Sequence, residues 1–208
     1  MTDRTTDSTS PGSTSPSPSQ GPPPGYVSDV KPHTEKVVIE EYDPSWPEQF
    51  RAEEELIRTA LGERALRVEH TGSTSVPGLP AKPVIDITLL VPDSADEDTY
   101  LPQLEAHGYT LRVREPDWYE HRCLATRTAQ GAHRNVNLHV FSPQRGAPEI
   151  ARMLLFRDWL RTHPEDRDLY AATKKRLAAR DWSYVQEYAD AKTEIVEQIL
   201  TRAAGSPE

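Results

Sequence analysis

The chain has 208 residues, a formal net charge of −9 at pH 7 and a hydrophobic content of 36%, which suits a globular domain. The acidic balance argues against a long nucleic acid as partner, because phosphate backbones bind cationic patches. No apolar run approaches the ~20 residues that a membrane helix needs, and no apolar signal segment follows the N-terminus. We therefore expect a cytoplasmic protein with no membrane partner. The one cysteine, Cys123, excludes an internal disulfide and a cysteine-rich metal site.

Residues 1–36 differ in composition from the rest of the chain. They are rich in Ser, Thr and Pro and carry few large apolar side chains, so they bury too little surface to offset the entropy of ordering. We predict a disordered tail over 1–36 and a single domain over 37–208. The alternative for the tail is a short polyproline ligand at residues 22–24.

The body begins with alternating strand-like and helix-like segments. Residues 43–47 predict a turn that leads into a helix with an apolar face from Phe50 to Leu61. A second helix is expected over 98–107. The predicted strands are residues 37–39, 66–69, 84–91, 109–113, 121–126 and 135–141.

The last third of the chain is helical. The spacing of apolar residues predicts helices over 149–161, 164–180 and 183–203, and Pro164 is tolerated because it opens the second of them. A mixed, mostly antiparallel sheet followed by a C-terminal helical bundle makes the predicted fold class α+β.

The most informative segment runs from His70 to Thr88. It begins with a short strand that leads into Gly72 and Ser73, followed by further small hydroxyl residues such as Thr74. Glycine lets a backbone approach a ligand closely, and successive backbone N–H groups and hydroxyls hold anions such as a triphosphate. This pattern predicts a phosphate-binding turn. The alternative is a plain turn with a helix cap.

Two predicted strands carry polar side chains on one face. Because alternate residues of a strand share a face, Asp86 and Thr88 lie opposite their apolar neighbours, and Asn137 and His139 repeat this pattern. A carboxylate on an apolar strand is costly to bury without a partner, so Asp86 requires a metal, a cation or backbone donors. If both strands are central, these four side chains line one polar cleft over the sheet.

Three runs of residues stand out, and two pairs follow them. They are HTGSTSVPGLPAKPVIDI at 70–87, NLHVF at 137–141 and LLFRDWLRTHPE at 154–165, then Tyr170 with Lys174 and Tyr188 with Lys192. Together they resemble the GrpB family, also called the UPF0157 group, over residues 37–203. The resemblance implies a polymerase-β-like fold of the nucleotidyltransferase superfamily. The family also occurs fused to dephospho-CoA kinase, which implies a partner in the coenzyme A pathway.

The resemblance also implies a set of site residues. In the superfamily a glycine–serine turn holds phosphates, and three carboxylates on two strands hold two Mg²⁺ ions. Gly72 and Ser73 match the turn and Asp86 matches the first carboxylate, whereas Thr88 and His139 stand where the other two are expected. Asp86 with phosphate oxygens therefore suits one Mg²⁺. Alternatively, Asp86 and His139 bind another divalent metal or act as an acid–base pair.

Further candidates for substrate binding are basic or hydroxyl-bearing side chains. Arg157 and Arg161 lie four residues apart on one predicted helix, so they share a face suited to clamping phosphates; the alternative is salt bridges with nearby acids. Trp118 falls in a loop that borders the predicted cleft. The remaining candidates, for which the alternative is a solvated surface, are Lys82, Lys174, Tyr188 and Lys192.

The leading functional hypothesis is a nucleotidyltransferase-like protein. It binds a nucleoside triphosphate or a related phosphorylated small molecule and transfers a nucleotidyl or phosphoryl group to a small acceptor. Asp86 and His139 are its predicted catalytic and metal-binding residues, and Mg²⁺ or another divalent metal is its cofactor. A second hypothesis is a degenerate nucleotide-binding module linked to coenzyme A metabolism. A third is an enzyme of different chemistry that uses Asp86 and His139 without a triphosphate.

Overall fold

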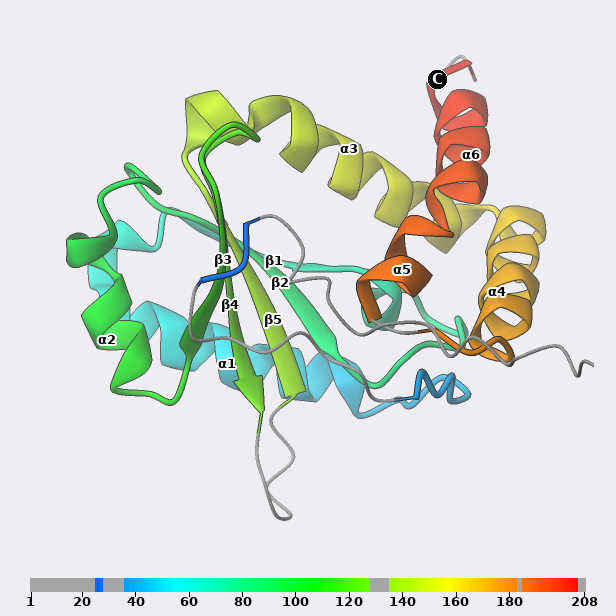
Figure 1. The fold of residues 1–208 in the computed structure, drawn as a ribbon, viewed down its shortest axis with the longest axis horizontal. Helices are drawn as coiled ribbons and strands as arrows, with labels where there is room; N and C mark the ends of the chain where they lie inside the picture. Colours follow the sequence, from blue (N-terminus) through cyan, green and yellow to red (C-terminus); the bar gives the residue numbers. More distant parts are fainter. Residues whose placement is uncertain (1–24, 28–35, 128–134, 183–184, 206–208) are drawn as a thin grey trace, which may run out of the picture.

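The computed structural model of the chain describes residues 25–27, 36–127, 135–182 and 185–205. These residues form a five-stranded sheet and a set of helices (Figure 1). The strands are β1 (Arg67–Thr71), β2 (Ile85–Leu90), β3 (Thr110–Glu115), β4 (His121–Arg127) and β5 (Asn135–Phe141). The α-helices are α1 (Trp46–Leu61), α2 (Leu101–Glu105), α3 (Pro143–Thr162), α4 (Pro164–Ala178), α5 (Val185–Asp190) and α6 (Thr193–Gly205). Short 3-10 turns are η1 (Gly62–Arg64), η2 (Ser73–Ser75) and η3 (Glu97–Thr99).

The strands of the sheet have the order β1-β2-β5-β4-β3. β2 and β5 pair in parallel, and the other neighbouring pairs of named strands are antiparallel. A parallel pair needs a long connection, which α2 and the β3–β4 hairpin supply between β2 and β5. The predicted α+β class, with a mixed sheet followed by C-terminal helices, is confirmed.

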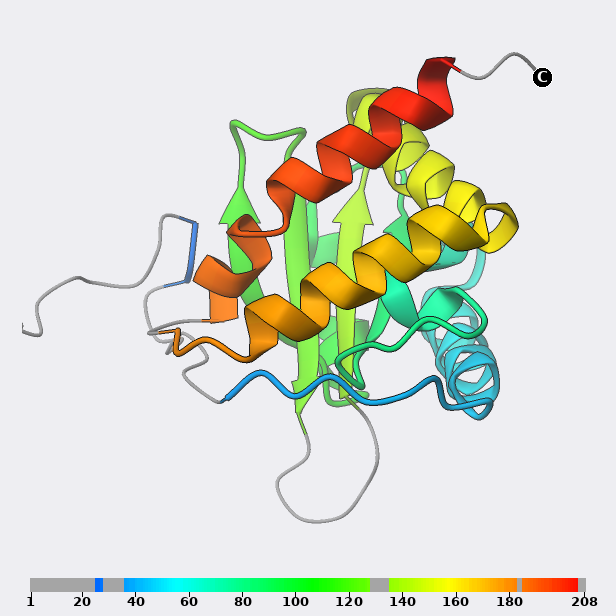
Figure 2. The ribbon, with the colours of Figure 1, turned by 90° about the vertical axis from the view of Figure 1, so that its right-hand side faces the viewer.

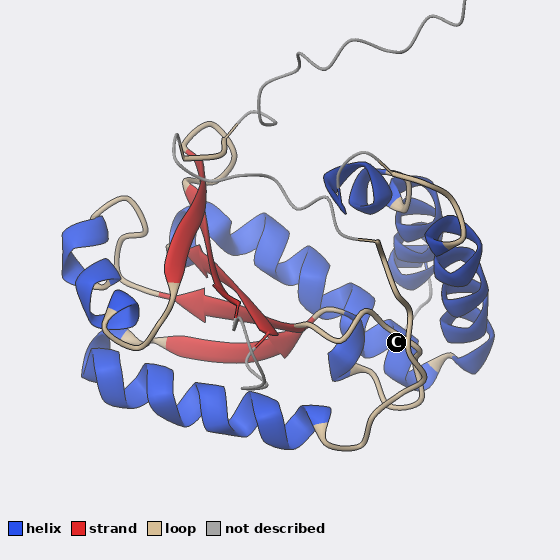
Figure 3. Ribbon diagram, turned by 60° about the horizontal axis from the view of Figure 1, so that its bottom comes forward, coloured by secondary structure: helices blue, strands red, loops and turns tan. Residues whose placement is uncertain are grey.

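One face of the sheet is apolar and holds the main core. Ile87 of β2 and Leu138 of β5 stand side by side, fully buried, in one cluster with Ile57 of α1 and Leu104 of α2. Figure 3 shows α1 running along the sheet. The period-two alternation predicted for β2 and β5 therefore directs their apolar residues against α1 and α2, and their polar residues to the opposite face.

The C-terminal helices pack on one another and on the loop after β1 (Figure 2). Leu160 of α3, Tyr170 of α4 and Ile199 of α6 form a cluster with Val76 and Leu79 of that loop. The loop is thus held between the sheet and the helices. No helix in the described part of the chain has the length and apolar composition that crossing a membrane requires.

The prediction of a strand at residues 37–39 is wrong. In the described residues this segment pairs with no strand, and a single bridge joins the following Glu40 to Ala81. Val37 is buried against the helical side, in a cluster with Leu177. Val37 and Ile39 therefore pack on the helical side, whereas Val38 is exposed.

Three helices differ from the expected boundaries. α3 begins at Pro143 instead of residue 149, since Ser142 is extended and proline fits the first turn. α2 is shorter than the helix expected over 98–107. The helix expected over 183–203 is split into α5 and α6 by a turn that contains Lys192; its expected first residues, 183–184, lie outside the described residues.

Most of the predicted tail, including the polyproline stretch at 22–24, lies outside the described residues. A short described part of it contacts the sheet. Tyr26 forms an isolated antiparallel bridge with Val113, and the Val27 N–H donates to the Arg112 carbonyl oxygen over 3.1 Å. This segment therefore extends the sheet at its β3 edge, and the rest of the tail stays a prediction.

The Leu138→Ala substitution tests the contribution of the central strands to stability. Leu138 is fully buried between β2 and β4, so this truncation should lower the free energy of unfolding by about 2–5 kcal/mol. Urea unfolding followed by circular dichroism measures the change. Leu169 of α4 is 45% exposed and provides the matched control, because Leu169→Ala should cost less than about 0.5 kcal/mol. Equal effects of the two substitutions would contradict the assigned core.

Candidate functional site

The turn after β1 depends on a glycine at position 72. Gly72 has a φ of 66°, in the left-handed region where residues with side chains are strained. A Cβ at this position would overlap the Asp86 carboxylate and would lie 2.8 Å from the Asp86 Cβ. The glycine therefore allows the turn to pack directly on Asp86 of β2.

The residues after Gly72 form the turn η2. The Ser75 hydroxyl fastens this turn by donating to the Gly72 carbonyl oxygen over 2.6 Å. Thr74 is buried, and its hydroxyl bonds to a backbone carbonyl oxygen and to Nε2 of His70, at 3.1 Å each. Gly72 and Ser73 line the neighbouring cleft. Of the three residues predicted to hold phosphate here, the structure therefore places Gly72 and Ser73 at the cleft and Thr74 in the interior behind it.

The polar residues predicted on one face of β2 and β5 are side by side. In the parallel pairing Asp86 stands beside Asn137, and Thr88 stands beside His139. Asn137 Nδ2 donates to Asp86 Oδ1 over 2.8 Å, which fixes the orientation of that carboxylate. The Thr88 hydroxyl lies 3.1 Å from the Thr71 hydroxyl. The predicted row of four polar side chains, Asp86, Thr88, Asn137 and His139, is thus present on one face of the sheet, but none of the four is among the residues that line the cleft described below.

His139 is the end of a hydrogen-bonded chain of side chains. Its Nδ1 lies 3.0 Å from Nε2 of His121, whose Nδ1 lies 2.7 Å from a carboxylate oxygen of Glu115. An ionised carboxylate only accepts, so His121 Nδ1 donates to Glu115, and the direction of the bond between His121 and His139 depends on the tautomer. Burial and the neighbouring His121 lower the pKa of His139 to about 3. His139 is therefore neutral at neutral pH.

Sequence analysis missed Glu115 and His121 as partners of His139. Neither belongs to a run of chemistry-bearing residues, and the sequence separates His121 from His139 by 18 positions. The two rings meet because β4 and β5 are antiparallel neighbours, with Cys123 opposite His139. The available signal was the position of His121 on a predicted strand. The register between β4 and β5 decided which residue the His121 side chain would reach.

Arg157 and Arg161 of α3 bind the segment that contains the turn. Arg157 Nη1 donates to Glu69 Oε2 over 2.7 Å and to the His70 carbonyl oxygen over 3.1 Å. Arg161 donates through Nε and Nη2 to the Ser75 carbonyl oxygen, over 3.1 and 2.9 Å. Both arginines therefore hold α3 against the turn. Arg157 also lines the cleft, whereas Arg161 lies outside its lining.

Lys174 of α4 is buried beside the turn. It is 2% exposed, and its Nζ donates to the Pro80 carbonyl oxygen over 2.6 Å and lies 4.7 Å from the centre of the Tyr170 ring. Burial, and to a lesser degree Lys192, lowers the pKa of Lys174 to about 6, although Asp86 acts in the opposite direction. Lys174 is therefore largely uncharged above neutral pH.

The other predicted binding residues divide between the cleft and its surroundings. Lys192 lines the cleft from the junction of α5 and α6, and its Nζ lies 4.8 Å from the centre of the Tyr188 ring. Tyr188 is buried, which raises the pKa of its hydroxyl. Lys82 is half-buried on the loop before β2. The structure thus brings Lys192 to the cleft and places Tyr188 and Lys82 outside its lining.

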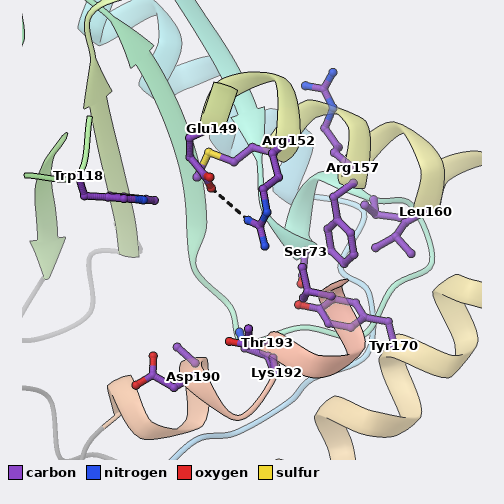
Figure 4. Close-up of a pocket in the computed structure, with 16 residues that line it drawn as sticks. Ser73, Trp118, Glu149, Arg152, Arg157, Leu160, Tyr170, Asp190, Lys192 and Thr193 are labelled. Carbon is purple, nitrogen blue, oxygen red and sulfur yellow. Dashed lines mark hydrogen bonds and ion pairs between the residues drawn. The ribbon is translucent and has the colours of Figure 1, made fainter. Parts of the chain in front are cut away.

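The cleft has a volume of about 440 Å³ and lies between the sheet side and the helices (Figure 4). Its cations are Arg152, Arg157 and Lys192, and its carboxylates are Glu149 and Asp190. Arg152 bonds to Glu149 over 3.2 Å. Sequence analysis did not single out Arg152, Glu149 or Asp190, because charged helix faces are usually solvated. The other lining residues are Gly72, Ser73, Val76, Trp118, Met153, Phe156, Leu160, Tyr170, Ala189, Thr193 and Val196.

The row of Asp86, Thr88, Asn137 and His139, called the polar row below, suits one divalent ion only when a substrate supplies further ligands. In the described residues, no group of three or more His, Cys, Asp or Glu side chains is arranged to hold a metal ion. Thr88 and His139 occupy the positions where the resemblance implied further carboxylates. Mg²⁺ commonly binds one or two carboxylates together with phosphate and water oxygens. Asp86 therefore fits one Mg²⁺ shared with phosphates, and the row does not fit a two-metal centre.

Comparisons with known proteins agree with the motifs. A model of the family described as "GrpB protein" matches residues 36–202. A UPF0157 protein of Halalkalibacterium halodurans is 56% identical over 177 residues, which are 85% of this chain and 87% of that protein. The crystal structure of the conserved protein GrpB from Enterococcus faecalis covers 80% of this chain and 96% of its own, with 32% identity and a TM-score of 0.70.

A more distant relative is a larger enzyme. The dephospho-CoA kinase of Mycolicibacterium paratuberculosis is 34% identical over 175 residues, which are 72% of this chain but 42% of the kinase. The similarity therefore spans less than half of that enzyme. Because the family model covers most of the chain, and close relatives align over most of both lengths, this chain belongs to the GrpB (UPF0157) family.

Proposed function

We propose that the cleft binds a nucleoside triphosphate, and that the protein transfers a nucleotidyl or phosphoryl group from it to a small acceptor. The observation that carries the proposal is the turn at Gly72. It packs on Asp86 beside a cleft whose lining includes three cations, Arg152, Arg157 and Lys192, and two carboxylates, Glu149 and Asp190. A nucleotidyltransferase needs such a turn for phosphate and such a carboxylate for a metal ion.

Even without a ligand, the cleft is arranged to bind a polyphosphate. The Ser73 hydroxyl and backbone N–H groups of the turn are donors for phosphate oxygens. Arg157 is already oriented by Glu69 and by the His70 carbonyl oxygen, so little side-chain entropy remains to be lost on binding. Lys192 adds a charge from the opposite wall.

Asp86 is the residue that would hold one Mg²⁺, jointly with phosphate oxygens. Its carboxylate is oriented by Asn137, and burial of the surrounding strands limits competition from water. The bound ion would withdraw charge from the phosphate that is transferred. Asp86 itself would set the position of the reacting phosphate relative to the turn.

His139 is the proposed acceptor of the proton in the transfer step. The oxygen of the acceptor bonds to phosphorus, and the bond from phosphorus to the leaving group breaks, releasing pyrophosphate in nucleotidyl transfer or a nucleoside diphosphate in phosphoryl transfer. The acceptor's proton moves to His139 Nε2, which requires the tautomer in which His139 Nδ1 donates to His121. The pKa of His139 is about 3 in the empty protein, which makes it a weak base. Bound phosphates favour the imidazolium and raise this pKa, and the His121–Glu115 pair holds the ring in place.

A second candidate function is a nucleotide-binding module without turnover. It is favoured by the polar row, which carries one carboxylate where two-metal transfer uses three. The dephospho-CoA kinase relative makes coenzyme A metabolism the setting of such a module and dephospho-CoA one of the compounds to test. Release of pyrophosphate or of a nucleoside diphosphate distinguishes the two functions, since a module releases neither above the buffer rate.

The Asp86→Asn substitution tests the metal role. An asparagine keeps an oxygen that accepts from Asn137, so the fold should be retained. In the wild-type protein, Mg²⁺ should strengthen the binding of one of ATP, GTP, CTP and UTP by about tenfold or more. Asp86→Asn should remove this dependence and abolish turnover. Calorimetric titration with and without Mg²⁺, together with an assay for released pyrophosphate and nucleoside diphosphate, measures both effects.

The Asp190→Asn substitution is the matched control for that experiment. Asp190 also lines the cleft, but it lies on α5 and not on the polar row. This variant should keep the Mg²⁺ dependence of the wild-type protein. Metal-dependent binding that persists in Asp86→Asn, or that is lost equally in both variants, would show that Asp86 does not hold the ion.

Lys174 provides a pH-dependent test of where phosphate binds. An anion close to Lys192 and Asp86 favours the charged form of Lys174 and so raises its pKa from about 6. The empty protein loses this proton as the pH rises through about 6, whereas the complex keeps it to higher pH. Binding of tripolyphosphate should therefore take up a proton above this pH, and affinity should fall as the pH rises.

Calorimetry in two buffers of different ionisation enthalpy measures this proton uptake. Lys174→Met keeps the volume of the side chain without its charge, so it should take up fewer protons and show a flatter decline of affinity with pH. Lys175→Met is the matched control, because Lys175 is the exposed neighbour that pairs with Glu41. Equal proton uptake by the two variants would place the phosphates away from Lys174.

A further inference from the structure

Trp118 presents a large apolar ring at the cleft. It lies in the hairpin between β3 and β4, it is 39% exposed, and it lines the same cavity as Ser73 and Lys192. Figure 4 shows its indole extending toward the cleft from the side opposite Tyr170. Leaving an indole partly in water is unfavourable, so an exposed indole at a binding cleft calls for an explanation beyond stability.

The backbone next to Trp118 is strained. Tyr119 and Glu120 both have positive φ, at 56° and 51°, although residues with side chains rarely adopt this conformation twice in succession. Three contacts hold Glu120 in place. The Ser94 hydroxyl and Arg122 Nη1 donate to its carbonyl oxygen, each over 2.9 Å, and Arg145 pairs with its carboxylate.

The inner side of the indole is anchored by aromatic rings. Trp118 meets His121 edge to face, with ring centroids 5.0 Å apart and an interplanar angle of 83°. It meets Phe141 in a similar way at 6.0 Å. The ring is therefore held in one orientation by its buried contacts, while its exposed part remains available at the cleft.

We propose that Trp118 is the stacking platform for the nucleobase of the bound nucleotide. The inference rests on the proposed function, because it assumes that the phosphates bind near Ser73 and Lys192 in the same cleft. A rigid, partly exposed indole is the side chain best suited to the face of a planar heteroaromatic ring. The strained hairpin then serves to hold this platform before the ligand arrives.

The experiment compares ligands with and without a base. Wild-type protein, Trp118→Ala and Trp118→Phe are titrated calorimetrically with ATP, GTP, CTP and UTP in the presence of Mg²⁺, and with tripolyphosphate. Trp118→Ala should weaken the tightest nucleotide by about tenfold to a hundredfold and leave tripolyphosphate unchanged. Trp118→Phe should retain most of the affinity, because a phenyl ring still stacks.

Fluorescence gives a readout that a structural role would not produce. The nucleotide should quench the tryptophan emission of the wild-type protein, and the quenching should be lost in Trp118→Phe although the other three tryptophans remain. Leu155→Ala is the control for loss of an exposed apolar side chain, because Leu155 of α3 is 41% exposed and lies outside the cleft. This variant should bind every ligand as the wild type does.

The outcomes separate this inference from the proposed function. Unchanged nucleotide affinity in Trp118→Ala overturns the stacking role and leaves the proposed function standing. Equal weakening of nucleotide and tripolyphosphate binding also overturns it, since Trp118 would then support the cleft and not the base. A wild-type protein that binds none of the nucleotides overturns the proposed function and this inference together.

Discussion

The backbone of Gly72 lies so close to Asp86 that a Cβ at position 72 would overlap the carboxylate. This contact fixes the turn η2 on strand β2, and the rest of the site depends on it. α3 reaches the same segment through Arg157 and Arg161, which donate to the carbonyl oxygens of His70 and Ser75. The sheet and the helices therefore meet at one turn, and the cleft lies where they meet.

In the proposed complex, a bound phosphate would act on two groups whose pKa values are lowered in the empty protein. Lys174 is buried and has a lowered pKa, and His139 is held neutral by burial and by His121. Both would gain a proton more readily beside a phosphate, because a nearby negative charge stabilises their charged forms. The cleft also keeps Arg152 and Arg157 paired with carboxylates until a ligand binds. Binding of phosphate would therefore exchange part of these ion pairs for contacts with the ligand.

The two proposals assign separate tasks to separate parts of the fold. The turn, Asp86 and the cleft's three cations, Arg152, Arg157 and Lys192, would bind phosphate and metal. The β3–β4 hairpin would bind the base through Trp118, and its strained residues are held by contacts from Ser94, Arg122 and Arg145. The single carboxylate of the polar row is what leaves a binding module as the second candidate function.

Local rules in the sequence determined the face on which each strand residue lies. Because side chains alternate along a strand, the sequence predicted that Asp86 and His139 share a polar face, and β2 and β5 pair accordingly. The sequence could not predict that residues 37–39 lack a partner strand, since a strand exists only where another segment bonds to it. It placed Trp118 in a loop bordering the cleft, but it could not select Arg152, because exposed charges look alike until packing turns some toward a cleft. The sequence thus determined the fold class and the turn at Gly72. Tertiary packing alone decided which side chains meet around that turn.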